Sequence, residues 1–188
     1  MNAADLPNGV TLHPSFVDAS RERELLDLID NAVWDNTLKR RVQHYGWRYD
    51  YRARKVLPGD YLGPLPIWLQ SEAARLRETG LFAQVPDQAI INEYLPGQGI
   101  SAHIDCEPCF GDQIASLSLG SRCCMTFQNH SDGQRIDITI PPQSLLLLQG
   151  EGRSQWSHAI PARKSDMIDG ARHMRHRRVS ITFRTVKS

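Results

Sequence analysis

The sequence predicts a mainly β fold of the α+β class, and three observations support this. Apolar residues recur at helical spacing only in two segments before residue 88. After residue 88, short apolar or alternating segments follow one another between Gly, Pro and Asn residues. A polar cluster at His103 and Asp105 has its candidate third member, His158, far downstream, so early and late strands must lie side by side. A double-stranded β-helix (jelly roll) meets this requirement, because its strands cross between two sheets.

Two helices are expected in the N-terminal half. Asp18 can cap a helix that runs to about Val33, with apolar residues three and four positions apart. A second helix is expected from Pro66 to about Thr79, because proline favours the first turn and Gly80 follows the last one. Both helices are expected to pack on the outer face of the major sheet.

The remainder of the chain is expected to form short strands. The expected strands are 88–95, 113–119, 122–128, 134–140, 143–149, 155–160 and 176–186. Segment 165–176 is rich in charged and small polar residues, and we expect a flexible loop there. Arginines in this loop could add contacts to phosphate, although a solvated loop is the simpler expectation.

The last strand alternates strictly between apolar and polar residues. Every second residue from Val179 to Phe183 is apolar, and the residues between them are polar, with Arg178 and Arg184 at the two ends. Such a strand can direct guanidinium groups into a barrel, where they bind carboxylates in a bidentate manner. The alternative is that these arginines are solvated edge charges that discourage aggregation.

His103, Asp105 and His158 form a candidate iron site. Two imidazoles and one carboxylate hold Fe(II) and leave coordination positions open. A His-x-Asp pair alone is a weak pattern, because the chain has seven histidines and a lone His is more often structural. An open iron site beside inward-facing arginines suggests a dicarboxylate cosubstrate. 2-Oxoglutarate fits, because it chelates iron at one end and needs a counter-charge at the other.

The second half of the chain resembles the AlkB-type Fe(II)/2-oxoglutarate-dependent dioxygenases. The family pattern is an Asn-x-Tyr, a Pro-Gly turn, a His-x-Asp, a distal His and a terminal Arg-x5-Arg. All of it is present in order, as Asn92, Tyr94, Pro96-Gly97, His103, Asp105, His158, Arg178 and Arg184. The resemblance implies Fe(II) as the metal, 2-oxoglutarate and O2 as cosubstrates, and His103, Asp105 and His158 as the catalytic metal ligands.

The resemblance also assigns the residues that bind 2-oxoglutarate. Arg178 and Tyr94 would reach its distal carboxylate, Asn92 would bind the end near iron, and Arg184 would complete the set. Ser180 would lie at the same site, where repair members of the family often carry Asn. This departure, together with the central motifs, looks most like the branch of tRNA wobble-uridine hydroxylases.

The segment from Lys39 to Lys55 is a candidate substrate-binding surface. It contains seven basic residues and one acidic residue, with aromatic residues between them. Cations that touch phosphates and aromatics that stack on bases form platforms for flipped bases. An edge hairpin with inward-packed tyrosines and solvated cations is an equally good alternative. In the resembled family this segment corresponds to the variable nucleotide-recognition lid.

Five residues are the candidates for substrate contact. Four come from the lid segment and one from the loop after the metal pair: Arg41, His44, Tyr45, Trp47 and Glu107. Glu107 stands where some repair members carry an acid that contacts a cationic damaged base. The alternative for Glu107 is an exposed loop carboxylate.

We therefore expect a single dioxygenase domain, 1–188, with a helical front and nucleotide-recognition lid at 1–87 and a jelly-roll catalytic core at 88–186. The expected function is oxidative demethylation of alkylated bases in DNA or RNA, with single-stranded or flipped-base nucleic acid as partner. One alternative is hydroxylation of a modified tRNA uridine or a protein side chain. Another is a non-catalytic nucleic-acid-binding module.

Composition adds a few expectations. The net charge of +1 provides no global positive field of the kind many nucleic-acid binders have. No apolar run reaches the roughly 20 residues of a membrane span, so we expect a cytoplasmic protein without membrane contact. We also expect a monomer. Cys106 and Cys109 lack the second Cys pair that structural zinc usually needs. We expect them as thiols on a loop near the metal, with Cys123 or Cys124 in the core.

Overall fold

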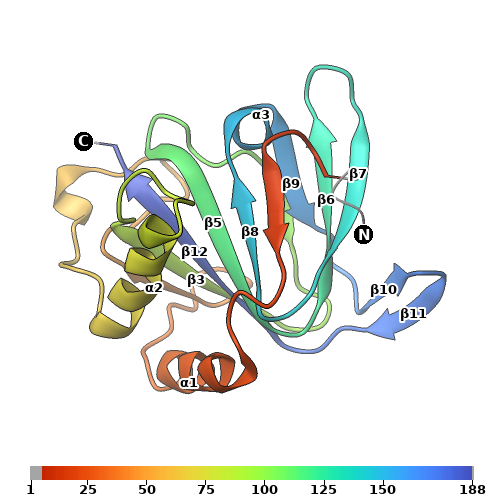
Figure 1. The fold of residues 1–188 in the computed structure, drawn as a ribbon, viewed down its shortest axis with the longest axis horizontal. Coiled ribbons are helices and arrows are strands. Elements are labelled where there is room, and N and C mark those ends of the chain that lie inside the picture. Colours follow the sequence, from red (N-terminus) through yellow and green to blue (C-terminus); the bar gives the residue numbers. More distant parts are fainter. Residues whose placement is uncertain (1–5, 188) are drawn as a thin grey trace.

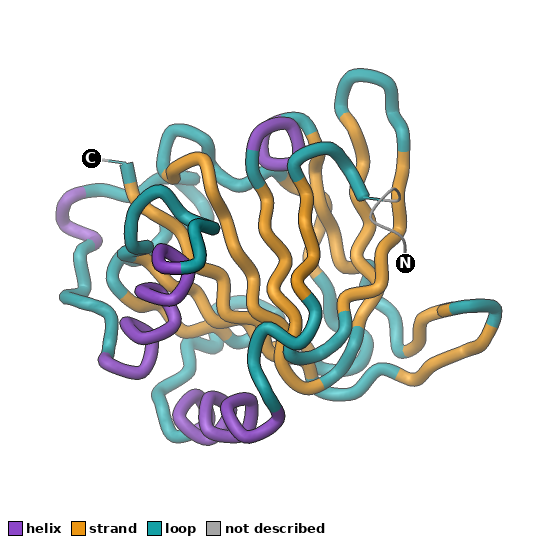
Figure 2. Tube along the Cα trace, in the orientation of Figure 1, coloured by secondary structure: helices purple, strands orange, loops and turns teal. Residues whose placement is uncertain are grey.

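The structure, a computed structural model, describes residues 6–187. Two antiparallel sheets face each other (Figures 1 and 2). The major sheet contains, in spatial order, β1 (Val10–His13), β8 (Ser144–Leu148), β5 (Phe110–Gly120), β12 (Arg178–Val186), β3 (Gln88–Tyr94) and β2 (Val42–Tyr45). The minor sheet contains β4 (Ile100–His103), β9 (Trp156–Ile160), β6 (Cys123–Asn129) and β7 (Arg135–Ile140). The expected mainly β architecture is confirmed.

Two helices cover the outer face of the major sheet, α1 (Ala19–Asp30) and α2 (Ile67–Glu78) (Figure 1). As expected, the Asp18 side chain caps α1, accepting a 2.7 Å hydrogen bond from the Arg21 amide. The expected extension to Val33 is wrong, because Asn31 caps the helix end and Val33 is 92% exposed. Short helical segments also occur at η2 (Pro58–Asp60) and α3 (Gly150–Ser154).

The major sheet is buried on both faces, and the alternation of β12 shows why. Its apolar residues from Val179 to Phe183 pack in the core under α1 and α2. Its polar residues, from Arg178 to Arg184, line the space between the two sheets. The expected direction of the two arginines into the barrel is therefore confirmed.

Three four-residue strands of the two facing sheets were not predicted from the sequence. β1 pairs with β8, β2 pairs with β3, and β4 pairs with β9. The first two lie before residue 88, so this part of the chain adds strands to the major sheet as well as helices to its surface. The alternation of apolar and polar residues that marks a strand is hard to recognise when the strand has only four residues.

Segment 165–176 is a hairpin, and the expected flexible loop is wrong. β10 (Ser165–Ile168) pairs with β11 (Ala171–Met174) around Asp169 and Gly170, which both have positive φ, 50° and 79°. An Asp-Gly pair with this geometry is a standard signal for a tight hairpin. Arg175 is also not a phosphate contact, because it is buried against Asp166.

The cysteines behave in two ways. Cys106 and Cys109 form a disulfide in the loop between β4 and β5, so the expectation of free loop thiols is wrong. Zinc binds thiolates, and a bonded pair offers none. Cys123 and Cys124 are free and buried, which confirms the expected core position.

Candidate active site

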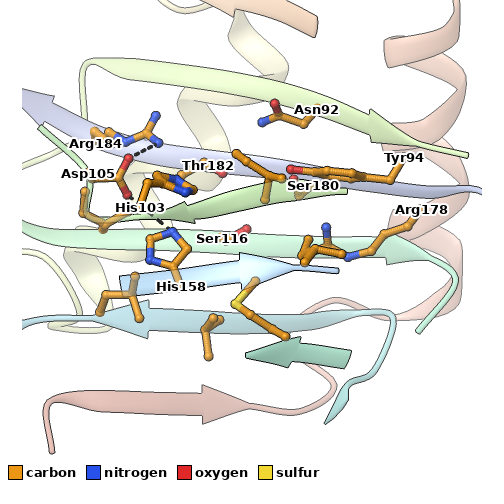
Figure 3. Close-up of a pocket in the computed structure, with 16 residues that line it drawn as sticks. Asn92, Tyr94, His103, Asp105, Ser116, His158, Arg178, Ser180, Thr182 and Arg184 are labelled. Atoms are coloured by element: carbon orange, nitrogen blue, oxygen red, sulfur yellow. Dashed lines mark hydrogen bonds and ion pairs between the residues drawn. The ribbon is translucent and has the colours of Figure 1, made fainter. Parts of the chain in front are cut away.

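His103, Asp105 and His158 meet between the two sheets (Figure 3). His103 ends β4 and lies directly opposite His158 of the paired strand β9, with the two ring centres 4.4 Å apart. Asp105 follows two residues later, and its Oδ2 lies 4.0 Å from His158 Nε2. The pairing of β4 with β9 therefore brings the distant parts of the sequence pattern together.

The charge states of these groups suit metal binding. Burial, followed by the neighbouring His103, lowers the pKa of His158 to about 4, so this imidazole is neutral at neutral pH. Burial alone would raise the pKa of Asp105, but the Arg184 guanidinium, 2.7 Å away, holds it well below its usual range. His103 Nδ1 lies 2.8 Å from the Ser101 carbonyl oxygen. Because a carbonyl only accepts, the neutral tautomer that fits this contact carries its proton on Nδ1 and has its lone pair on Nε2.

This donor set fits Fe(II). Two neutral imidazoles and an ionised carboxylate are the donors of non-haem iron oxygenases, which keep open positions for other ligands. Within residues 6–187 no three His, Cys, Asp or Glu side chains already close around one point. Oδ1 of Asp105 accepts a hydrogen bond from Arg184 Nη2.

Arg178 lies at the end of the same cavity away from His103 and Asp105, where its N–H groups can donate to an anion (Figure 3). It is 3% exposed, and its Nη2 donates a 2.7 Å hydrogen bond to Ser118 Oγ. Its Nε and Nη1 are buried without a partner among the described residues. Tyr94 lies beside it, with the Arg178 guanidinium carbon 5.4 Å from the ring centre. Burial raises the pKa of Tyr94, which keeps the hydroxyl protonated as a donor.

All five residues predicted to bind 2-oxoglutarate line this inner cavity of about 60 Å³. In Figure 3 Arg178 and Tyr94 lie at the end away from His103 and Asp105, whereas Arg184 lies beside Asp105. A buried, unpaired cation at one end and metal donors at the other suit a dicarboxylate that chelates the metal.

A larger outer cavity of about 590 Å³ opens from the inner one. The two share five lining residues: Asn92, Ile100, His103, Asp105 and Arg184. The outer mouth is formed by Leu38 and by five residues of the lid segment: Lys39, Arg40, Tyr49, Tyr51 and Arg54. A substrate in this cavity would lie next to His103 and Asp105.

The outer cavity is not lined by the lid residues that we expected. Arg41 is paired with Glu93, its Nη2 2.9 Å from Oε1. Tyr45 packs on Trp68 under the helices, because it lies on the outer face of β2.

Trp47, His44 and Glu107 also lie outside the cavity lining. Trp47 donates to Asp87 Oδ2 at 3.2 Å, and its ring packs against Tyr61 at an angle of 53°. His44 is largely buried against Tyr51. Glu107 is exposed on its loop, in agreement with the alternative for that residue.

Several site residues were missed. The basic, aromatic composition of the lid pointed to the segment, but an irregular segment has no periodicity from which to choose Arg40 or Tyr51 over their neighbours. Arg153 was also missed, although it is 5% exposed and donates to the backbone carbonyls of Asp105 and Cys106 at 2.9 and 3.3 Å. It thereby ties α3, just before the His158 strand, to the loop that carries Asp105.

Comparison with known proteins agrees with this geometry. The family model described as the 2OG-Fe(II) oxygenase superfamily matches residues 29–184. The chain belongs to this superfamily. It is therefore a dioxygenase that uses Fe(II), 2-oxoglutarate and O2, as the sequence pattern implied.

The relatives place this superfamily member in its AlkB-like group. The chain is 36% identical over 203 residues to the Arabidopsis thaliana "Alkylated DNA repair protein ALKBH8 homolog", covering 96% of this chain and 59% of that protein. It is 39% identical over 171 residues to the Xenopus tropicalis "tRNA (carboxymethyluridine(34)-5-O)-methyltransferase alkbh8", covering 87% of this chain and 27% of that protein. The chain thus spans less than two thirds of either relative.

A solved structure shows the same fold. The structure of OsALKBH1 superimposes with a TM-score of 0.69 at 17% sequence identity, and the match covers 96% of this chain and 98% of that one. Among residues 6–187, no helix combines the length and apolar character that a membrane span requires.

Proposed function

We propose that this AlkB-like dioxygenase oxidises an uncharged or anionic modified base in RNA, in particular a 5-substituted uridine of tRNA. In this proposal His103, Asp105 and His158 hold Fe(II), and Arg178, Tyr94, Asn92, Ser180 and Arg184 hold 2-oxoglutarate. When bound, iron activates O2 and couples the conversion of 2-oxoglutarate to succinate and CO2 with oxidation of a substrate C–H bond.

The charge of the outer cavity carries the proposal. Lys39, Arg40 and Arg54 line its mouth, and its one carboxylate, Asp105, is paired with Arg184. A cationic alkylated base would meet like charges here, and the carboxylate that could have compensated, Glu107, is exposed outside the lining. A neutral or anionic base suits the cavity better.

Two further observations support a uridine of tRNA. The Xenopus relative has carboxymethyluridine of tRNA in its name, although the chain spans 27% of that protein. Tyr49 and Tyr51 supply aromatic rings in the outer cavity, and base recognition outside a duplex relies on stacking against such rings. A cytoplasmic, monomeric protein remains part of this proposal.

The test compares substrates by product mass. The protein is loaded with Fe(II) and 2-oxoglutarate without oxygen and then exposed to O2 with one of three oligonucleotides. They carry a 5-carboxymethyluridine in an anticodon stem-loop, a neutral N6-methyladenine, or a cationic 1-methyladenine. We expect a mass gain of about 16, one oxygen atom, on the uridine substrate, coupled to succinate. Efficient turnover of the cationic base with an unchanged uridine contradicts the proposal.

Oxidative demethylation of an alkylated base is the second candidate. The name of the Arabidopsis relative, an alkylated DNA repair protein homolog, favours it. Hydroxylation of an N-methyl group gives an unstable product that releases formaldehyde, whereas hydroxylation at carbon gives a stable alcohol. Formaldehyde together with loss of a methyl group from either methylated oligonucleotide identifies this reaction.

A binding module without turnover is the least favoured alternative. The Arg178 guanidinium, buried in the inner cavity with two nitrogens that have no partner among the described residues, is costly for a protein that binds no anion there. Normal oligonucleotide binding with no succinate under any condition supports that alternative instead.

A further inference from the structure

Arg40 lies at the junction of the two cavities. It lines the outer cavity, and its Nε donates a 2.9 Å hydrogen bond to Oδ1 of Asn92, which lines both. Its guanidinium carbon lies 5.9 Å from the ring centre of Tyr51. Within residues 6–187, this is the one hydrogen bond from the Arg40 side chain to the protein.

The chemistry of this contact fixes the orientation of the Asn92 amide. Arginine has N–H donors and no acceptor, so the group that faces Arg40 must be the amide oxygen. The amide nitrogen, with its two donors, then faces the opposite way. In Figure 3 it lies on the side of the cavity where Arg184 and Asp105 are found.

This orientation matters for an anion. A carboxylate of 2-oxoglutarate at the metal end is attracted by the Asn92 NH2 group and is repelled by its carbonyl oxygen. Asn92 is 8% exposed, so water offers little competition for either group. An amide free to turn would present its donors only part of the time.

We propose that Arg40 is a positioning residue for the cosubstrate, which holds the Asn92 amide with its donors toward 2-oxoglutarate. This inference rests on the proposed function, in which Asn92 binds 2-oxoglutarate. It gives a lid residue a role in cosubstrate affinity that is separate from any contact with the base.

The test measures binding of 2-oxoglutarate, without nucleic acid, to protein loaded with Mn(II) as a redox-inert substitute for iron, by titration calorimetry. R40M keeps the length of the side chain and removes the donor, whereas R40K keeps a donor. K39M is the matched control, because it removes the same charge from the adjacent position and the same cavity mouth. We expect R40M to weaken binding about tenfold, and R40K and K39M to change it less than about threefold.

A double-mutant cycle makes the test specific. If Arg40 acts through Asn92, R40M has no further effect in an N92A background. Equal weakening by R40M and K39M, or full additivity with N92A, overturns the inference and points to general charge attraction. R40K also covers the case in which R40M fails to fold, because a roughly tenfold loss of 2-oxoglutarate affinity in R40K, which keeps a donor, overturns the inference too. Absence of 2-oxoglutarate binding by the parent protein instead contradicts the proposed function.

Discussion

The buried guanidinium group of Arg178 lacks hydrogen-bond acceptors in the protein alone. Two of its guanidinium nitrogens are buried without a partner among residues 6–187, and only Ser118 satisfies the third. Buried, unpaired cations destabilise a fold unless an anion joins them. The anion expected here is the distal carboxylate of 2-oxoglutarate.

We therefore predict opposite effects of R178M on binding and on stability. Loss of a charge-assisted pair should weaken 2-oxoglutarate binding by roughly a hundredfold. The melting temperature of the protein without cosubstrate should stay constant or rise, because an isolated buried charge has been removed. Calorimetric titration and thermal unfolding check the two results. A large fall in melting temperature with intact binding would assign Arg178 to the fold instead.

His44 provides a prediction about pH. Burial, followed by the charge of Arg48, lowers its pKa to about 4, and its Nδ1 is buried without a partner in the described part of the chain. Asp35 also faces it and acts in the opposite direction. The unfolded chain, with a histidine pKa near 6.5, therefore binds more protons than the folded protein between about pH 4 and 6.5. The contribution of His44 to stability is complete above this window and is lost as pH falls through it.

The measurement is urea unfolding of the metal-free protein from pH 7 to pH 4. His158 titrates in the same window, so only the difference between the parent and H44F isolates His44. As the pH falls, we expect the free energy of unfolding to decrease less steeply for H44F than for the parent. The two slopes should differ by up to about 1.4 kcal/mol per pH unit. Parallel curves for the two proteins contradict the assignment.

At this scale, the residues that the sequence identified are those in regular patterns. The set of His103, Asp105 and His158 follows from spacing, and Arg178 and Arg184 follow from the alternation of one strand. Substrate residues in the irregular lid have no such constraint. Arg41 was preferred from composition, yet the chain directs it to Glu93 and directs its neighbour Arg40 into the site.

Among the elements, the β10–β11 hairpin depends on one buried cluster of charges. Arg175 Nη2 and Nε donate to both oxygens of Asp166 at 2.7 Å, and Arg163 adds a third bond at 2.6 Å. Burial alone would raise the pKa of Asp166, but the two arginines lower it to about 2. The cluster connects the hairpin to β6, because Asp166 also accepts from the Cys124 amide.

We predict that R175M destabilises the protein by roughly 3 to 5 kcal/mol, because it leaves a buried carboxylate with one arginine fewer. R172A is the matched control: Arg172 is an exposed arginine of the same hairpin, and its loss should change stability by less than about 0.5 kcal/mol. The free energies of unfolding of the two variants, measured by chemical denaturation, test this prediction. Equal, small effects would mean that Asp166 gains its stability from Arg163 alone.

The predictability of the elements follows their length. The two twelve-residue helices and strands such as β12 gave several periods each, and the structure places them within a few residues of expectation. β1, β2 and β4 have four residues each and are defined by their partners across the sheet. The hairpin carried a local Asp-Gly signal, which its charged composition obscured.

At the scale of the whole molecule, the two faces of the major sheet have different roles. The face under α1 and α2 is apolar and stabilises the fold, and the interior face carries the polar groups of the site. The lid segment lines the outer cavity that adjoins this interior. The disulfide of Cys106 and Cys109 lies against it, with the two sulfur atoms 3.3 and 3.5 Å from the Arg54 carbonyl oxygen. The lid segment and the loop between β4 and β5 are therefore in contact at the outer cavity, although they are about 50 residues apart in the sequence.

The distribution of charge over the molecule leads to a last prediction. The net charge is +1, so long-range attraction to RNA is weak, and the cations at the outer mouth must provide most of it. Binding of an RNA stem-loop should therefore weaken with salt, and each lid cation that contacts a phosphate should contribute about one unit to the logarithmic slope. K39A and R54A should each reduce that slope. R77A, which removes an exposed cation from α2 on the far side of the major sheet, should not. Fluorescence anisotropy at several salt concentrations gives the three slopes, and an equal reduction in all three would show that RNA binds the molecule without regard to the lid.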